Sequence, residues 1–171
     1  MAVLPIIKLG HPTLRKKAEP VTEYNDDLKE LAQNMVETMR LNEGIGLAAN
    51  QVNVLQRVFV IDWQLIDEEL DAKAYVNPEI LAKEGNEIGE EGCLSIPDVR
   101  GDVPRAYKIT VRYQTLEGET VEEDLEDLPA RVFQHELDHL NGVLFIDRIS
   151  PIQKKLLEPQ LTKIRETYSV L

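Results

Sequence analysis

The chain has 171 residues but only one cysteine, which excludes an internal disulfide framework and leads us to expect a reducing, cytoplasmic setting. It also lacks a long hydrophobic run: no segment approaches the roughly 20 apolar residues of a membrane span, and the first residues lack the apolar stretch of a signal peptide. Basic residues are scarce, with 19 Lys and Arg against 31 Asp and Glu and a net charge of −12. Such a surface argues against tight binding to nucleic acid.

Nothing in the sequence divides the chain into parts. There is no internal repeat, low-complexity tract or linker, and the 43% apolar composition suits a single domain over residues 1–171 with one core. Two acidic runs, at residues 67–71 and 117–127, are interpreted as solvated surface that aids solubility.

Helical patterns occur near both ends of the chain. Apolar residues recur at spacings of three and four after Asn25, which predicts an amphipathic N-terminal helix that is capped by Asn25 and ends near Leu41. A C-terminal helix is expected to begin with Ser150 as its cap and Pro151 at its first position. Pro159 would kink or restart that helix.

Strand patterns occupy the middle of the chain. Strands are expected over residues 57–62 and 74–81, and residues 107–116 and 120–125 read as a hairpin joined across Glu117-Gly118. The strands do not alternate regularly with helices, so the expected class is α+β, with mostly antiparallel sheets around a central helix.

That central helix carries the motif H-E-L-D-H at residues 135–139, and we expect it to begin near residues 128–129 and to end at Gly142. Residues four apart lie on one face of a helix, so His135 and His139 can bind a single metal ion. Glu136 between them is placed to accept a proton from an attacking water. Short motifs of this kind recur by chance, and incidental surface histidines are the alternative.

The rest of the helix favours burial of the histidines. Leu128 and Val132 share their stripe, while apolar residues also occupy the opposite side, at Phe133, Leu137 and Leu140. A helix that is apolar on two faces runs through the middle of a domain. Buried imidazoles need partners, and one metal ion serves two of them at once.

A catalytic metal of this kind usually takes three protein ligands, and the sequence offers three candidates for the third. Metzincins place a histidine six residues after the second one, where this chain has Phe145, so that class is excluded. Thermolysin-like proteases use a later glutamate, and Glu158 lies 19 residues after His139. Cys93, in an extended or turning segment over residues 90–97, is the third candidate.

A lone cysteine is more often a small buried hydrophobe than a ligand. Cys93, however, completes an established catalytic set of one thiolate, two imidazoles and one open position. The spacing favours Cys93 over Glu158 but leaves both open.

A second segment, G-I-G-L-A-A-N-Q at residues 44–51, contains the G-x-G-x-x-A letters of a dinucleotide-binding loop. That loop must follow a strand and open a helix. Here the segment follows a predicted helix and precedes a predicted strand, so the dinucleotide reading fails and no such cofactor is expected. A glycine-rich turn remains the structural interpretation.

Three segments together resemble the signature motifs of the peptide deformylase family. They are G-I-G-L-A-A-N-Q at residues 44–51, E-G-C-L-S at residues 91–95 and Q-H-E-L-D-H at residues 134–139, in the family's order and approximate spacing. Residues 11–15 and 141–147 are also similar to family sequence, and the likeness covers roughly residues 3–148.

The resemblance implies a cytoplasmic hydrolase that removes the N-formyl group from the N-terminal formyl-methionine of nascent polypeptides and releases formate. It implies Cys93, His135 and His139 as the metal ligands. Fe(II) is the expected native metal, with zinc, nickel or cobalt as alternatives.

The family also assigns roles to other residues. Glu136 would be the general base, while the Gln51 side-chain amide and the Leu94 backbone N–H would donate to the oxyanion. The peptide would lie as an added strand, with its methionine in an apolar pocket. The residues expected to bind it are Ile45, Gly46, Gly92, Leu128 and Val132. Arg131 stands where many family members carry an aliphatic residue, which leaves the exact lining of that pocket open.

The C-terminal tail suggests a further partner. In some family members a basic C-terminal helix docks on the ribosome, and this tail offers Lys154, Lys155, Lys163 and Arg165. Pro159 and the acids Glu158 and Glu166 dilute that charge, so ribosome docking is a hypothesis. A thermolysin-like protease that uses Glu158 and a non-catalytic metal-binding module remain as alternative functions.

Overall fold

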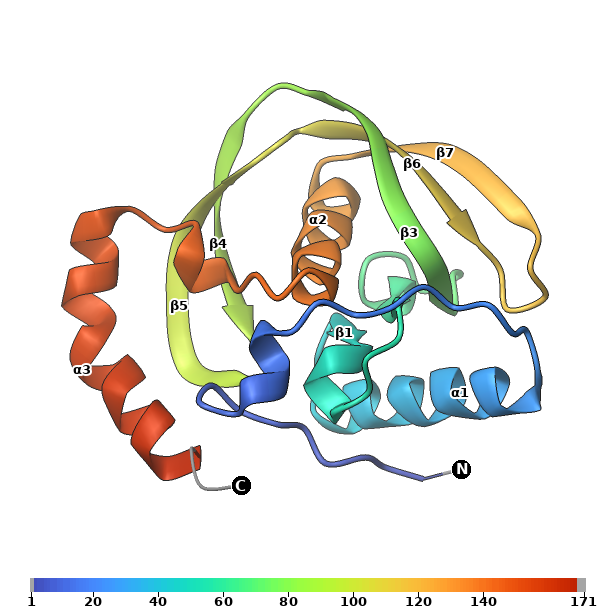
Figure 1. The fold of residues 1–171 in the computed structure, drawn as a ribbon. Coiled ribbons are helices and arrows are strands. Elements are labelled where there is room, and N and C mark those ends of the chain that lie inside the picture. The colour runs from blue at the N-terminus through green and yellow to red at the C-terminus, as the bar shows by residue number, and fades with distance from the viewer. Residues whose placement is uncertain (1, 169–171) are drawn as a thin grey trace.

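The computed structural model describes residues 2–168, and its architecture confirms the α+β class (Figure 1). The helix α2 (Leu128–Leu140) lies at the centre, with the long strands arching over it. The helix α1 (Asp26–Leu41) packs against the first two strands, and α3 (Pro151–Tyr168) lies on the outside of the molecule against β5.

The strands form two antiparallel sheets. The larger sheet has the order β1-β2-β3-β6-β7, so β1 is one of its edges. Its members are β1 (Gly46–Ala48), β2 (Val58–Asp62), β3 (Ala72–Glu84), β6 (Lys108–Gln114) and β7 (Thr120–Glu126). The smaller sheet is a hairpin of two strands, β4 (Glu87–Cys93) and β5 (Ile96–Arg105).

Most of the predicted elements are confirmed. The Asn25 side chain caps α1 by accepting a hydrogen bond from Leu28 N at 3.1 Å, and Gly118 turns between β6 and β7 at a φ of +87°. The Ser150 hydroxyl accepts from Gln153 N at 3.2 Å and caps α3. Pro159 was expected to kink or restart this helix; the restart is wrong, because α3 continues through Pro159. Pro159 is exposed, so water can hydrate the carbonyl that its missing N–H leaves unpaired.

The β4–β5 hairpin and the short strand β1 were not predicted as strands. In β4 the residues alternate poorly between buried and exposed, and only Glu91 is buried. β5 does alternate, but its buried positions include Gly101 and Arg105, which give no apolar signal. β1 has three residues and lies in the segment that was interpreted as a glycine-rich turn.

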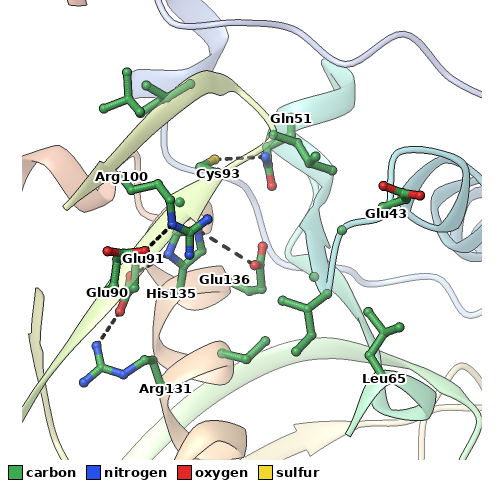
Figure 2. Close-up of a pocket in the computed structure, with 18 of the residues that line it drawn as sticks. Glu43, Gln51, Leu65, Glu90, Glu91, Cys93, Arg100, Arg131, His135 and Glu136 are labelled. Atoms are coloured by element: carbon green, nitrogen blue, oxygen red, sulfur yellow. Dashed lines mark hydrogen bonds and ion pairs between the residues drawn. The ribbon is translucent and has the colours of Figure 1, made fainter. Parts of the chain in front are cut away.

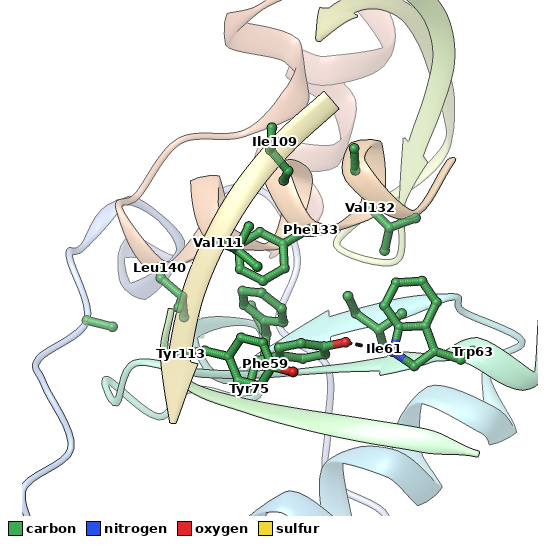
Figure 3. Packing of buried hydrophobic residues seen from close by; sticks show 13 residues of the cluster. Phe59, Ile61, Trp63, Tyr75, Ile109, Val111, Tyr113, Val132, Phe133 and Leu140 are labelled. Atoms are coloured by element: carbon green, nitrogen blue, oxygen red, sulfur yellow. Dashed lines mark hydrogen bonds between the residues drawn. The ribbon is translucent and has the colours of Figure 1, made fainter. Parts of the chain in front are cut away.

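The helix α2 is buried on two sides, as its sequence predicted. Phe133 and Leu140 are fully buried in the main core cluster, and the Phe133 ring meets the Phe59 ring edge-on with centroids 5.1 Å apart (Figure 3). A separate apolar cluster joins β5 to α3 through residues that include Val103 and Leu161. No helix within residues 2–168 has the length and apolar character needed to cross a membrane.

Candidate metal centre and active site

Three side chains bring metal-ligating atoms together on the inner side of the hairpin. The His135 and His139 Nε2 atoms are 3.2 Å apart, and the Cys93 Sγ lies 3.3 Å from His139 Nε2. The possible ligand atoms of Cys93, His135 and His139 all lie within 4.8 Å of one another, close enough to hold one ion. Among residues 2–168, no other group of three or more Cys, His, Asp or Glu side chains comes this close together.

The spacing fits a metal ion. Ligands bonded to one tetrahedral ion at 2.0–2.3 Å stand roughly 3.3–3.6 Å apart, close to the distances seen here. Both histidines are buried, and two imidazole lone pairs at this separation repel each other unless a cation or a proton lies between them. One thiolate and two imidazoles therefore form a donor set suited to a divalent metal.

The three candidate ligands come from two different elements. His135 and His139 lie one turn apart on α2, as predicted, whereas Cys93 is the last residue of β4, where the hairpin register shifts. Glu158 is not part of the group: it lies half-exposed on α3 and pairs with Arg165 at 3.0 Å. The structure therefore removes Glu158 as the third ligand, and with it the thermolysin-like alternative.

A buried carboxylate orients one of the ligands. Glu91 Oε1 lies 2.8 Å from His135 Nδ1, so His135 donates Nδ1–H to Glu91 and keeps its Nε2 lone pair for a metal. Arg105 binds the same carboxylate through two nitrogens, both at 2.9 Å. Burial works to raise the pKa of Glu91, but the hydrogen bonds from His135 and Arg105 outweigh it and hold that pKa well below its usual range.

The ion pairs continue from the Glu91 carboxylate through Arg105 to Asp138 on α2. Arg105 also binds Asp138 on α2 at 2.5 Å, and Asp138 accepts a further bond from Arg148. Sequence reasoning missed Glu91, Arg105 and Asp138. The only available signal was that Glu91 and Asp138 fall inside the two motifs that supply the ligands.

Glu136 faces the same space with a free oxygen. Its carboxylate is buried, and its Oε1 has no hydrogen-bond partner among the residues that the structure describes. Burial raises the pKa of Glu136 to about 7, which suits a group that must accept a proton and return it. Gly46 on β1 makes room for this carboxylate, since a Cβ atom there would stand 2.5 Å from Glu136 Oε2.

Gln51 is held in one orientation beside Cys93 (Figure 2). Its Oε1 accepts from Ala48 N at 3.0 Å, which fixes the amide, and its Nε2 donates to Ser95 Oγ at 3.1 Å. The same nitrogen lies 3.4 Å from Cys93 Sγ. Because an amide nitrogen carries two hydrogens, Gln51 keeps one donor that points toward the ligand group.

These residues surround a pocket of about 610 Å³, a size typical of small-ligand sites. All the residues predicted from sequence line it except His139, which lies one turn after His135 on α2. The predicted lining residues are Ile45, Gly46, Gln51, Gly92, Cys93, Leu94, Leu128, Val132, His135 and Glu136.

Residues 3–155 match the family model described as polypeptide deformylase. The chain belongs to this family. A peptide deformylase of Acidobacterium capsulatum is 47% identical over 165 residues, which cover 96% of this chain and 97% of the relative. The peptide deformylase of Thermotoga maritima is 49% identical over 159 residues, 92% of this chain and 94% of the relative.

Solved structures of deformylases agree with the fold. The Thermus thermophilus peptide deformylase superposes with a TM-score of 0.89 at 39% identity, over 97% of this chain and 99% of that one. The Plasmodium falciparum peptide deformylase superposes with a TM-score of 0.91 at 35% identity, over 96% of this chain and 97% of that one. The predicted family is confirmed, and the chain is a deformylase: an enzyme of a metal-dependent family that hydrolyses the N-formyl amide of nascent peptides.

Proposed function

We propose that this pocket is where the chain carries out deformylation, with Cys93, His135 and His139 holding the metal. The observation that supports this most strongly is the convergence of the three ligand atoms, within 4.8 Å of one another, beside the buried Glu136 carboxylate. A divalent metal held by these residues would supply Lewis acidity and would help to activate the attacking water. Fe(II) is the proposed native metal, and zinc, nickel and cobalt are alternatives because thiolate and imidazole accept all of them.

Glu136 is proposed as the general base and then the general acid. Its unpartnered Oε1 can take a proton from the attacking water and return it to the departing amine. The carboxylate lies near His135, with Oε2 4.0 Å from His135 Nε2. Both proton transfers therefore occur beside the ligand group.

Two donors are proposed to stabilise the oxyanion that forms on the formyl oxygen. Gln51 Nε2 has a hydrogen turned toward Cys93, and Leu94 follows Cys93 in the turn of the hairpin. The bond from Ala48 N to Gln51 Oε1 keeps the amide from rotating, so the donor is in place before the charge develops.

The peptide is proposed to add as a strand. β1 is an edge of the larger sheet, so backbone groups near Ile45 and Gly46 are available for pairing. Gly92 of β4 lines the pocket opposite them. The methionine side chain would enter between Leu128 and Val132, which both line the pocket from α2.

The direct test is formate release from a formyl-methionyl peptide, measured anaerobically with iron and again with nickel. Cys93→Ala should abolish metal binding and turnover, while the matched change Glu158→Ala should alter neither. Metal binding without turnover for any divalent metal would contradict this pocket as the place of deformylation. Retention of metal by Cys93→Ala would contradict the ligand set.

We further propose that the chain works as one domain in the cytoplasm and that α3 can dock on the ribosome. Leu161 and Ile164 of α3 are buried, whereas Ile152 and Leu156 are 75% and 74% exposed, which leaves an outer apolar stripe. Because α3 is part of the core, deleting it would also damage the fold. Charge reversal at the exposed Lys155 is the cleaner test: unchanged ribosome affinity would contradict this docking mode.

A further inference from the structure

The centre depends on how the β4–β5 hairpin sits against α2, because one ligand belongs to the hairpin and two belong to the helix. The main core cluster packs α2 against the larger sheet, and β5 packs its own apolar residues against α3. The bonds between α2 and the hairpin, in contrast, come from charged and polar side chains, namely Glu91, Arg105, Arg131, His135 and Asp138.

Arg131 of α2 reaches both strands of this hairpin. Its Nη1 donates to Glu91 Oε2 at 2.7 Å and to the Val103 carbonyl at 2.8 Å, and its Nη2 donates to the Glu87 carbonyl at 2.7 Å. Only 13% of the side chain is exposed. Three bonds at fixed angles from one planar group hold a position more tightly than a single ion pair does.

Gly89 provides the space that this arrangement needs. A Cβ atom at Gly89 would stand 2.8 Å from Arg131 Cζ and 2.9 Å from its Nε, so the guanidinium lies directly against the β4 backbone. Arg131 and Gly89 therefore form a fitted pair across the contact between helix and hairpin.

We propose that Arg131 is a positioning residue that holds the hairpin against α2 and thereby sets the position of Cys93 relative to His135 and His139. The proposal rests on the ligand set proposed above. Arg131 acts through Glu91, whose other oxygen receives Nδ1–H from His135. It also lines the substrate pocket with Leu128 and Val132, so one carboxylate connects a pocket wall with a metal ligand.

The test uses the cobalt-loaded protein and two readouts: the thiolate-to-cobalt charge-transfer absorption and the rate at which a chelator removes the metal. Arg131→Met keeps the length of the side chain but removes every hydrogen bond. Loss of the carboxylate that orients a ligating histidine typically weakens metal affinity by roughly 10–100-fold. Because Arg131 holds that carboxylate rather than the ligand itself, we expect metal release to accelerate by up to about that factor and the absorption to shift.

Two further variants separate the positioning effect of Arg131 from a general loss of charge. Gly89→Ala keeps Arg131 but places a Cβ against its guanidinium, so it should accelerate release in the same direction. Arg131→Lys keeps the charge beside Glu91 but cannot reach both strands, and it should fall between wild type and Arg131→Met. Arg112→Met is the matched control, because it removes an arginine that pairs with Glu79 and Glu122 on the larger sheet, away from the hairpin.

Amide hydrogen exchange of the metal-free protein checks the mechanism. In Arg131→Met we expect faster exchange in β4 and β5, with α2 unchanged. Wild-type release rates and absorption in both Arg131→Met and Gly89→Ala would overturn the positioning role of Arg131. A uniform loss of protection from amide exchange over the whole chain would also overturn it. Absence of the charge-transfer absorption from the wild-type protein would instead overturn the ligand set on which the proposal rests.

Discussion

The helix α2 and the β4–β5 hairpin supply the same centre but are held by different forces. α2 is fixed by apolar packing, with Phe133 fully buried against Phe59 and Tyr75. The hairpin meets α2 through directional charged bonds, with Glu91 and Arg105 at their centre. Apolar packing decides where the helix lies, whereas the charged bonds decide how far Cys93 stands from the histidines.

This difference predicts that stability and chemistry separate. Changes in the apolar surroundings of α2 should lower the free energy of unfolding and leave the chemistry of folded molecules nearly intact. Changes among the polar groups that face the pocket should impair the chemistry and leave the free energy of unfolding nearly intact. Four substitutions test this comparison.

The largest effect is expected for Glu136→Gln, which alters the chemistry of α2 without altering its packing. General acid–base catalysis contributes roughly 10²–10⁴-fold, so kcat/KM for a formyl-methionyl peptide should fall by about that factor. Metal content should not change, because the ligand atoms belong to other residues. Full activity in a metal-loaded Glu136→Gln protein would remove the general-base role.

Phe133→Ala should produce the opposite pattern. It removes a fully buried ring from the main cluster, and such changes typically lower the free energy of unfolding by about 3–5 kcal/mol. Urea unfolding measures this loss. Turnover per folded, metal-loaded molecule should stay within a few-fold of wild type, and a large loss would show that packing and chemistry are not separable in α2.

Gln51→Ala removes one proposed oxyanion donor from the short 3-10 helix Ala49–Val52, which lies outside both elements. Loss of such a donor typically lowers kcat by roughly 10²–10³-fold. Loss of the hydrogen bond from Ala48 N should also lower the free energy of unfolding, but by less than Phe133→Ala does. If KM rises while kcat is unchanged, the Gln51 amide binds substrate without favouring the transition state.

The smallest effect is expected for Arg112→Met on the larger sheet. Arg112 pairs with Glu79 and Glu122, but its side chain is 44% exposed, and water and salt screen exposed ion pairs so that they contribute little to stability. Its unfolding free energy and deformylation rate should both stay close to wild type. A loss comparable to that of Phe133→Ala would show that ion pairs on the sheet surface also hold this fold.

The comparison also explains what sequence could predict. α1, α2 and the β6–β7 hairpin follow from apolar spacing, caps and turn residues, and the three proposed ligands follow from motifs. The β4–β5 hairpin does not, since Gly89, Gly92 and Gly101 interrupt its pattern.

The charged bonds escape sequence reasoning for a different reason. Glu91 meets Arg105 and Arg131 across 14 and 40 residues of sequence, and no periodicity marks such pairs. The family motifs point to Cys93 and the histidines, but the groups that place Cys93 emerge only when the chain is folded.

X-ray absorption at the metal edge of the zinc-loaded protein tests most directly the claim that hairpin and helix share one metal. The predicted shell contains one sulfur at about 2.3 Å and two imidazole nitrogens at about 2.0–2.1 Å. In Cys93→Ser the sulfur should disappear while the nitrogens remain. A wild-type shell of nitrogen and oxygen alone would contradict the account, because Cys93 would then not be a ligand.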